Sequence, residues 1–429
     1  MKKTASYLLV LLSSMSFGQM WTELEKDQII RYWNEPNRYV TASTGKPGVR
    51  LTVDGSKWLW EYNRRRGKGK TNPGLVPPPS SDQEAKWEKW IDARVAYDRW
   101  RAQPLAVVVP DPGPAPADLV ELAGNPPQFA SLVTPNKHVV TIDGKQFAYE
   151  DNLDMRPRFA YYRFTDGVRS FGTKLGTLPP EELNLILDTA GVDASAAKVF
   201  KAVSLLEGGF DSLNTYDTGF ISVGFIQFAA LAEGGHSLGQ TLLQFKTDDP
   251  IGFGKDFRRF GIDVTPTGLV VALDTNNRDE RVGAGANQQA IKDKRLAAVF
   301  QRAGQFSAYR VAQVKTAKRM YWPAKEKWSI KKPTGEIISG TLDEIISSEA
   351  AMAIFLDRKV NTGSLGFLNA VLQAIADDQQ EYCVDVLKRF EGILVETLWY
   401  RYNPNGDTVL TKPQPCEMLP AVMEKFKRS

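Results

Sequence analysis

One glutamate, Glu207, ends an apolar helical segment of the sequence and precedes a pair of glycines. At the carboxyl end of a helix the backbone carbonyls disfavour a negative charge, and apolar neighbours such as Leu205, Leu206 and Phe210 add a desolvation penalty. Both effects raise the pKa of a carboxyl group and keep it protonated near neutral pH. A general acid that donates a proton to a glycosidic oxygen needs this property. Glu207 is therefore the expected catalytic acid, and a solvated helix end is the plainer alternative.

A second carboxylate, Asp217, follows in the turn formed by residues 216–219. Glycine at the end of this turn tolerates a positive φ, and residues 220–223 then alternate like a strand. A hairpin that folds back over the helix end would bring Asp217 and Ser222 towards Glu207. In glycoside hydrolases a second carboxylate positions water or stabilises the transition state. We expect Asp217 in this role, with Ser222 orienting the water or holding Asp217.

Four further polar side chains are candidates for hydrogen bonds to a sugar. Each has a structural alternative, because turns commonly contain asparagine and tyrosine, and polar residues at helix ends act as caps. Residues 225–228 are expected to begin the helix after the hairpin, with Gly224 allowing a close approach of the chain. The four candidates are Asn214, Tyr216, Gln227 and Asn361.

The order of these features resembles the active-site pattern of the lysozyme superfamily. Phage-type lysozymes have a glutamate, an Asp-Thr pair that opens a hairpin and a threonine on the return strand, similar to Glu207, Asp217-Thr218 and Ser222. Goose-type lysozymes and soluble lytic transglycosylases have a stretch similar to residues 224–227. Residues 353–363 look like a helix-end segment of some lysozyme-like and chitosanase-like domains. The resemblance covers about residues 180–402 and implies a mainly α, α+β fold with a lysozyme-like helical domain and a small β-hairpin at the active site.

The resemblance also implies an activity, that of an exported glycoside hydrolase that cleaves the glycan strands of peptidoglycan. It would be of the muramidase or lytic transglycosylase type, with this polysaccharide as its partner. If Asp217 lies far from Glu207, Glu207 alone acts first as acid and then as base. A chitosanase- or chitinase-like hydrolase on the same fold and a non-catalytic wall-binding protein are the alternatives. No cofactor or metal is implied, because His138 and His236 do not form an HExxH pattern.

Composition and the first residues indicate export. Lys2 and Lys3, the apolar residues 7–12 and the small residues near 16–18 form the pattern of a secretory signal peptide over residues 1–18. The apolar run is too short to cross a bilayer. We therefore expect a secreted or periplasmic protein without an integral membrane segment, the alternative being an N-terminal anchor or buried helix. The 54 basic and 50 acidic residues nearly balance, so no nucleic-acid partner is indicated.

Composition divides the remaining chain into four segments. Residues 104–116 form a proline-rich linker. Residues 117–179 form a small antiparallel β element with turns at Asp143-Gly144 and Asp166-Gly167, and residues 180–429 form the lysozyme-like helical domain. A cut in the linker would leave residues 117–429 as a unit that folds alone.

The first of the four segments, residues 19–103, is rich in tryptophan, and its indoles either fill the core of a small domain or stack on sugar rings. Farther along the chain, Cys383 and Cys416 either pair or remain buried thiols. Seven of the ten tryptophans precede residue 101, namely Trp21, Trp33, Trp58, Trp60, Trp87, Trp90 and Trp100.

Overall fold

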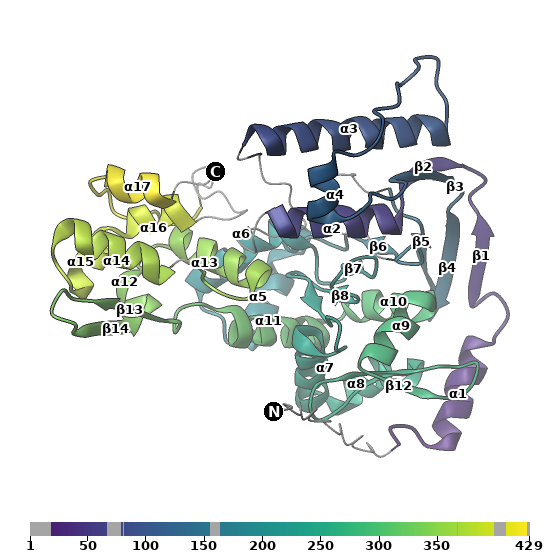
Figure 1. Ribbon diagram of the computed structural model, residues 1–429. Coiled ribbons are helices and arrows are strands. Elements are labelled where there is room, and N and C mark those ends of the chain that lie inside the picture. Colours follow the sequence, from purple (N-terminus) through teal and green to yellow (C-terminus); the bar gives the residue numbers. More distant parts are fainter. Residues whose placement is uncertain are drawn as a thin grey trace, which may run out of the picture.

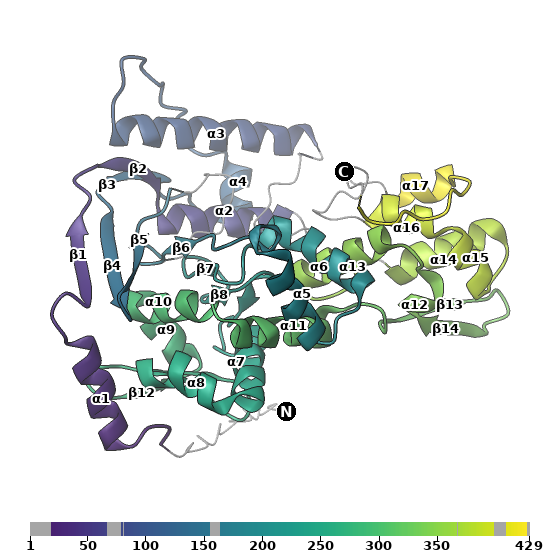
Figure 2. The ribbon, with the colours of Figure 1, turned by 180° about the vertical axis from the view of Figure 1, so that it is seen from behind.

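The structure, a computed structural model, describes residues 19–66, 79, 81–154, 164–366, 368–398 and 409–426. The expected signal peptide, residues 1–18, lies outside them. The described chain is of the α+β class, with many helices and small antiparallel sheets. Figures 1 and 2 show a helical C-terminal lobe at one end of the molecule and the N-terminal helix α1 near the other. None of the described helices has the length and apolar character needed to cross a membrane.

Four helices surround the central core. Helix α6 (Ala194–Glu207) packs against α13 (Glu349–Thr362), and α11 (Ser307–Tyr321) packs against α7 (His236–Asp248). Asp193 caps α6 as an N-terminal residue should, because its carboxylate accepts a hydrogen bond of 2.8 Å from the backbone N–H of Ala196. Burial of apolar side chains on all four helices stabilises this arrangement, for example Val199, Leu242, Tyr309 and Ile354.

A four-stranded antiparallel sheet, three of whose strands follow α6 in the chain, has the order β6 (Arg169–Ser170), β7 (Leu213–Asn214), β8 (Ser222–Val223), β9 (Phe228–Ala229). The sheet corrects one expectation. Residues 225–228 do not begin a helix, because residues 224–227 form a turn that leads into β9, and the next helix, α7, begins only at His236. Phe225 and Phe228 are both buried in the core, and the turn allows both side chains to point into it.

The N-terminal segment joins the main core. Strand β1 (Tyr39–Ser43) pairs with β4 (Asn136–Ile142), which in turn pairs with β5 (Lys145–Glu150). The expected Asp143-Gly144 hairpin is confirmed, with φ values of 49° and 79° at the two turn residues. The indole N–H of Trp33, at the end of α1 (Glu23–Trp33), donates a 3.0 Å hydrogen bond to the carbonyl of Phe260.

The tryptophans divide between two cores. Trp21 and Trp33 belong to the main core, whereas Trp58 and Trp90 form a second cluster with Leu119 and Phe129. Residues 104–116 therefore do not separate the packing on their two sides, which differs from the expected linker. Strand β2 (Gly48–Leu51) also pairs with β3 (Ala130–Val133) across the same segment.

Two other expectations differ in detail. The expected Asp166-Gly167 hairpin has a first strand that lies outside the described residues apart from Phe164, and its second strand, β6, pairs with β7. Cys383 is exposed and Cys416 half-buried, and the two are not bonded. The thiols are therefore neither paired nor both buried.

The chain is not helical between residue 345, where one short helix ends, and the start of α13. Glu391, which is 2% exposed, accepts hydrogen bonds from the backbone N–H and hydroxyl groups of both Ser347 and Ser348. Ser348 also caps α13 through the N–H of Ala351. These bonds favour a break, because serine side chains that bond the backbone compete with helix continuation.

The remaining elements complete the molecule. Those not yet given are α2 (Val53–Arg66), α3 (Asp82–Ala102), α4 (Ala117–Ala123), the 3-10 helix η1 (Leu175–Thr177), α5 (Pro180–Thr189), α8 (Pro250–Asp256), the 3-10 helix η2 (Arg258–Phe260), β10 (Ile262–Val264), β11 (Val270–Leu273), β12 (Glu280–Val282), α9 (Ala284–Lys292), α10 (Lys294–Ala303), β13 (Lys327–Lys331), β14 (Ile337–Thr341), α12 (Leu342–Ile345), α14 (Leu368–Gln379), α15 (Val384–Arg389), α16 (Glu391–Leu398) and α17 (Pro420–Phe426).

Replacement of Trp33 by alanine tests whether α1 is part of the main core. Trp33 is 3% exposed, so Trp33→Ala should lower the free energy of unfolding by about 3–5 kcal/mol, the usual cost of removing a buried tryptophan. Urea unfolding measures the change. Trp100→Ala, at a half-buried position of α3, is the control and should cost about 1 kcal/mol or less. Equal effects of the two variants would contradict the shared core.

Candidate active site

One open cavity of about 660 Å³ brings together all the site residues expected from the sequence. It lies between the end of α6, the four-stranded sheet, α11 and the end of α13. Its volume falls in the range of ligand-binding clefts. The expected residues among those that line it are Glu207, Asn214, Tyr216, Asp217, Ser222, Gln227 and Asn361.

Glu207 is the last residue of α6 and is half-buried. Asn361, in the last turn of α13, donates a hydrogen bond of 3.2 Å from Nδ2 to Glu207 Oε1. The same amide nitrogen donates to the backbone carbonyl and to the carboxylate of Asp357, at 2.8 and 3.1 Å. The side chain of Asn361 therefore links Glu207 to the buried Asp357. It positions the glutamate and also lines the cavity.

The apolar surroundings expected for Glu207 are only partly present. Phe210 is fully buried, but Leu205 is 60% and Leu206 41% exposed. These two leucines lie on the solvent side of α6 and cannot exclude water from the carboxyl group. The carboxyl end of α6 still disfavours a negative charge on Glu207, since this interaction depends on the position of the residue in the helix.

Asp217 is held by its own turn. The Nδ2 group of Asn214 donates a 2.6 Å hydrogen bond to Asp217 Oδ2, and the backbone N–H of Gly219 donates one of 2.8 Å to Oδ1. Asn214 also accepts a bond from the N–H of Tyr216 at 3.0 Å. Asn214 therefore positions the turn, and because it lines the cavity its expected contact with a sugar stays a prediction. A hydrogen-bonded turn of this kind fixes the direction of a carboxylate before any ligand binds.

Ser222 lies directly behind this turn. A Cβ atom added at Gly219 would lie 2.3 Å from the Ser222 hydroxyl and 3.1 Å from Asp217 Oδ1. Glycine is therefore required for the close approach of the turn to β8. The expected neighbourhood of Asp217 and Ser222 is present, and the hydrogen bonds that fix Asp217 include those from Asn214 and Gly219.

A buried amide holds the loop beneath the cavity. Gln313, on α11 and 0% exposed, donates from Nε2 to the carbonyl of Phe210 at 2.9 Å and accepts the N–H of Phe225 at 3.4 Å. Its contacts fix the two ends of the segment that carries Asp217. A Cβ atom at Gly224 would lie 2.2 Å from Gln313 Oε1, so only glycine fits there.

Gln227 contributes to the same loop. Its Nε2 group donates to the Ser212 hydroxyl at 2.6 Å and to the carbonyl of Gly224 at 3.1 Å. Ser212 in turn donates to the Gly224 carbonyl at 2.8 Å. Gln227 is not a helix cap, because no helix begins here, and its amide nitrogen serves the loop. Its side chain still lines the cavity.

Backbone strain is concentrated around the cavity. Phe220, Gln227, Leu231 and His236 have φ values of 63°, 55°, 53° and 43°. They are four of the nine non-glycine residues with positive φ in the described chain. Each such conformation costs free energy and persists only where the surrounding structure enforces it, which occurs most often at functional sites.

Sequence reasoning missed Tyr321, the last residue of α11, which also lines the cavity. Burial raises the pKa of Tyr321, a hydrogen bond with Ser237 opposes the rise, and the negative charge of Glu207 adds to it. The phenol is therefore a neutral hydrogen-bond donor near Glu207. No local motif marks Tyr321, because it reaches the cavity only through the packing of α11. Arg169, Phe171 and His236 also line the cavity, and no local motif marks them either.

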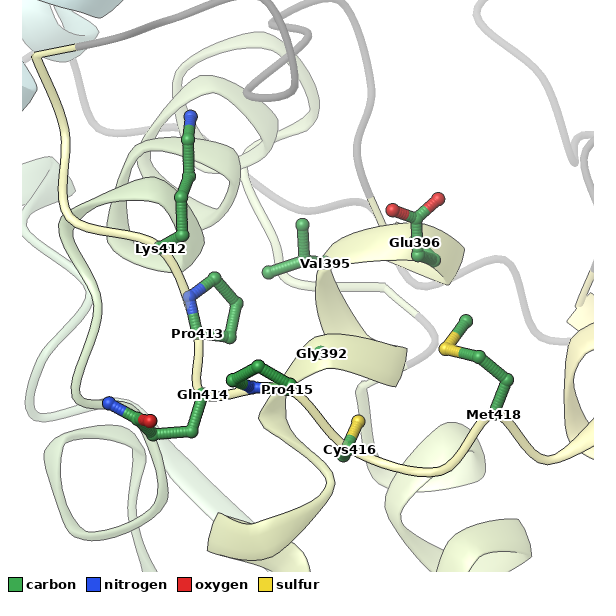
Figure 3. Close-up of a pocket in the computed structure, with 9 residues that line it drawn as sticks. All are labelled: Gly392, Val395, Glu396, Lys412, Pro413, Gln414, Pro415, Cys416 and Met418. Atoms are coloured by element: carbon green, nitrogen blue, oxygen red, sulfur yellow. The ribbon is translucent and has the colours of Figure 1, made fainter.

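The described ranges contain no group of three or more histidine, cysteine, aspartate and glutamate residues suited to a metal ion. A smaller cavity of about 380 Å³ lies in the C-terminal lobe (Figure 3). Its lining includes one carboxylate, Glu396, and the thiol of Cys416, which faces Gly392. The larger cavity, with two fixed carboxylates, is therefore the better candidate for acid–base chemistry.

Comparisons of the chain with protein-family models, with curated proteins and with solved structures found no match. The interpretation of the cavity therefore depends on the geometry of its residues.

Replacement of Gln313 tests what holds the loop in place. Gln313→Leu keeps most of the volume but leaves the backbone groups of Phe210 and Phe225 without this amide, so the free energy of unfolding should fall by about 1–3 kcal/mol. Gln244→Leu, at a partly exposed site on α7, should change it by no more than about 0.5 kcal/mol. Urea unfolding compares the two. A Gln313→Leu variant as stable as Gln244→Leu would show that the amide does not hold the loop.

Proposed function

We propose that the cavity is the active site of a lysozyme-like domain that hydrolyses the glycan strands of peptidoglycan. One observation carries the proposal. Glu207, at the end of a helix, and Asp217, in the hairpin turn that follows, line the same cavity with Ser222. Two carboxylates at one cleft are the usual equipment for cleavage of a glycosidic bond. Export by the signal expected at residues 1–18 would bring the enzyme to this polymer.

In the proposed reaction Glu207 donates its proton to the oxygen of the leaving sugar. The hydrogen bond from Asn361 to Glu207 Oε1 orients the carboxyl group at the cavity, where it would face the glycosidic oxygen. The neutral phenol of Tyr321 donates a hydrogen bond to the sugar or to the leaving oxygen beside Glu207. The end of α6 supports the acid role, because it disfavours the charged form of Glu207 before the proton is transferred.

Asp217 completes the mechanism by positioning water or stabilising the oxocarbenium-like transition state. Its carboxylate is fixed by Asn214 and Gly219, which suits a group that must act without reorganisation. Ser222 lies close enough to the turn to orient a water molecule beside Asp217. A lytic transglycosylase differs at this point, because Glu207 would then act alone as acid and as base.

Glu207→Gln is the first test of the proposal. The amide keeps the shape of the side chain but cannot donate the proton, so the rate of wall lysis should fall by about 10²–10⁴-fold, with the melting temperature unchanged or higher. Release of soluble sugars from purified peptidoglycan measures the rate. Glu233→Gln removes an exposed carboxylate from the same region of the chain and should keep full activity.

Full activity of Glu207→Gln would contradict the proposed function. A wild-type protein that binds wall material without turnover, and still binds it as Glu207→Gln, would instead support the wall-binding alternative. Turnover of chitosan but not of peptidoglycan would replace the substrate and keep the acid role.

Asp217→Asn separates the two mechanisms. If Asp217 acts on water or on the transition state, its loss should reduce the rate by about 10²–10⁴-fold, as for Glu207. The hydrogen bond from Gly219 to the side-chain oxygen remains possible, so the turn should persist. Mass spectrometry of the products gives the second readout: hydrolysis adds water, whereas a transglycosylase releases an anhydro sugar. A small rate loss together with anhydro products would contradict the two-carboxylate mechanism.

A further inference from the structure

An arginine with no ion-pair partner among the described residues lines the same cavity. Arg169, on the edge strand β6, is half-buried and shares the cavity with Glu207 and Asp217. Within the ranges that the structure describes, no carboxylate forms an ion pair with it, and its contacts are with rings. Its guanidinium carbon lies 4.5 Å from the ring centre of Phe171 and 5.9 Å from that of Tyr216.

Three arginines of this protein that have little exposure are paired with carboxylates. Arg295 pairs with Asp293 at 2.7 Å, and Arg302 pairs with Asp256 at 2.9 Å. Arg310 forms an ion pair with Glu182. Arg169 differs from these three, and its guanidinium opposes the rise that burial causes in the pKa of Tyr216. A guanidinium has five N–H donors, so donors remain for a ligand.

The ring beneath Arg169 is also presented to a ligand. Phe171 is 62% exposed, and it lines the cavity beside the guanidinium. A planar cation stacked on an exposed ring offers two kinds of contact at once: paired N–H groups that fit a carboxylate, and an apolar face that fits the C–H face of a sugar. No described carboxylate of the protein forms an ion pair with these N–H groups.

We infer that Arg169 and Phe171 form a subsite for a sugar that bears a carboxylate. The inference rests on the proposed function and narrows its substrate class to aminosugar strands whose alternate sugars carry a free carboxyl group, as in peptidoglycan strands without peptide stems. The Asp217 carboxylate repels a substrate carboxylate near its own turn, so the acidic sugar lies at the β6 end. This contact sets the register of the polymer, and it disfavours cationic chitosan, whose amino groups Arg169 repels.

Binding of three tetrasaccharides tests the subsite. The first alternates N-acetylglucosamine with N-acetylmuramic acid, the second is the same compound with its carboxyl groups converted to amides, and the third is neutral chitotetraose. Calorimetry with Glu207→Gln as the background prevents turnover. The acidic tetrasaccharide should bind about tenfold more tightly than the other two. The amide compound controls for the bulk of the substituent.

Three substitutions in this background assign the preference to its residues. Arg169→Gln should remove the preference for the acidic compound and leave the affinity for chitotetraose within about twofold. Arg169→Lys keeps the charge without the fork and should retain part of the preference. Arg389→Gln is the matched control, because Arg389 lies over the ring of Phe390 at 5.2 Å outside the cavity. It should leave all affinities unchanged.

The outcomes separate this subsite from the proposed function. If the protein binds and cleaves the glycans with no preference for the acidic compound, or keeps that preference in Arg169→Gln, the subsite is refuted and the proposed function stands. If none of the three compounds binds and Glu207→Gln has no effect on wall lysis, both are refuted. Unchanged chitotetraose binding by Arg169→Gln shows that the variant is folded.

Discussion

The cleft depends on one buried amide, that of Gln313. The segment between α6 and β9 is mostly turns and strands of two residues, which supply few hydrogen bonds of their own. Gln313 bonds this segment at Phe210 and at Phe225, and Gly224 lets the backbone reach the amide. A buried amide left without partners is costly, so the helix and the loop specify each other. The residues with positive φ at the cleft keep their strained conformation because this contact and the aromatic core beneath it hold the backbone in place.

The two carboxylates of the cleft are held in the same way although they come from different elements. Each accepts a hydrogen bond from an asparagine amide, Glu207 from Asn361 and Asp217 from Asn214. An amide donor orients a carboxylate but leaves its charge in place, whereas a lysine or arginine would neutralise that charge. The pair therefore keeps its capacity for acid–base chemistry while its direction is fixed. Arg169, the cation of the cleft named above, contacts the rings of Phe171 and Tyr216. It does not form an ion pair with Glu207 or Asp217.

The sequence predicted local features well and tertiary ones poorly. The Asp143-Gly144 hairpin and the cap of α6 by Asp193 depend on neighbouring residues, and both were predictable. The site residues near Glu207 were found because one short segment contains most of them. Residues 225–228 were misjudged because their conformation is decided by burial against α11. The place of Tyr321 in the cavity could not be predicted either, because it lies far from Glu207 in the sequence and only the packing of α11 brings the two together. The partners of Trp33 and Trp58 likewise depend on segments that lie far away in sequence.

The placement of α1 has a consequence for the order of events during synthesis. The indole of Trp33 bonds a carbonyl 227 residues later, and the backbone N–H of Met20 bonds Glu280, 260 residues later. At a translation rate of about 5–20 residues per second, the N-terminal helix waits roughly 10–50 s for its partners to leave the ribosome. During this interval two large indoles have no core to enter. The first described helix thus cannot dock fully until residues 260–280 have been made.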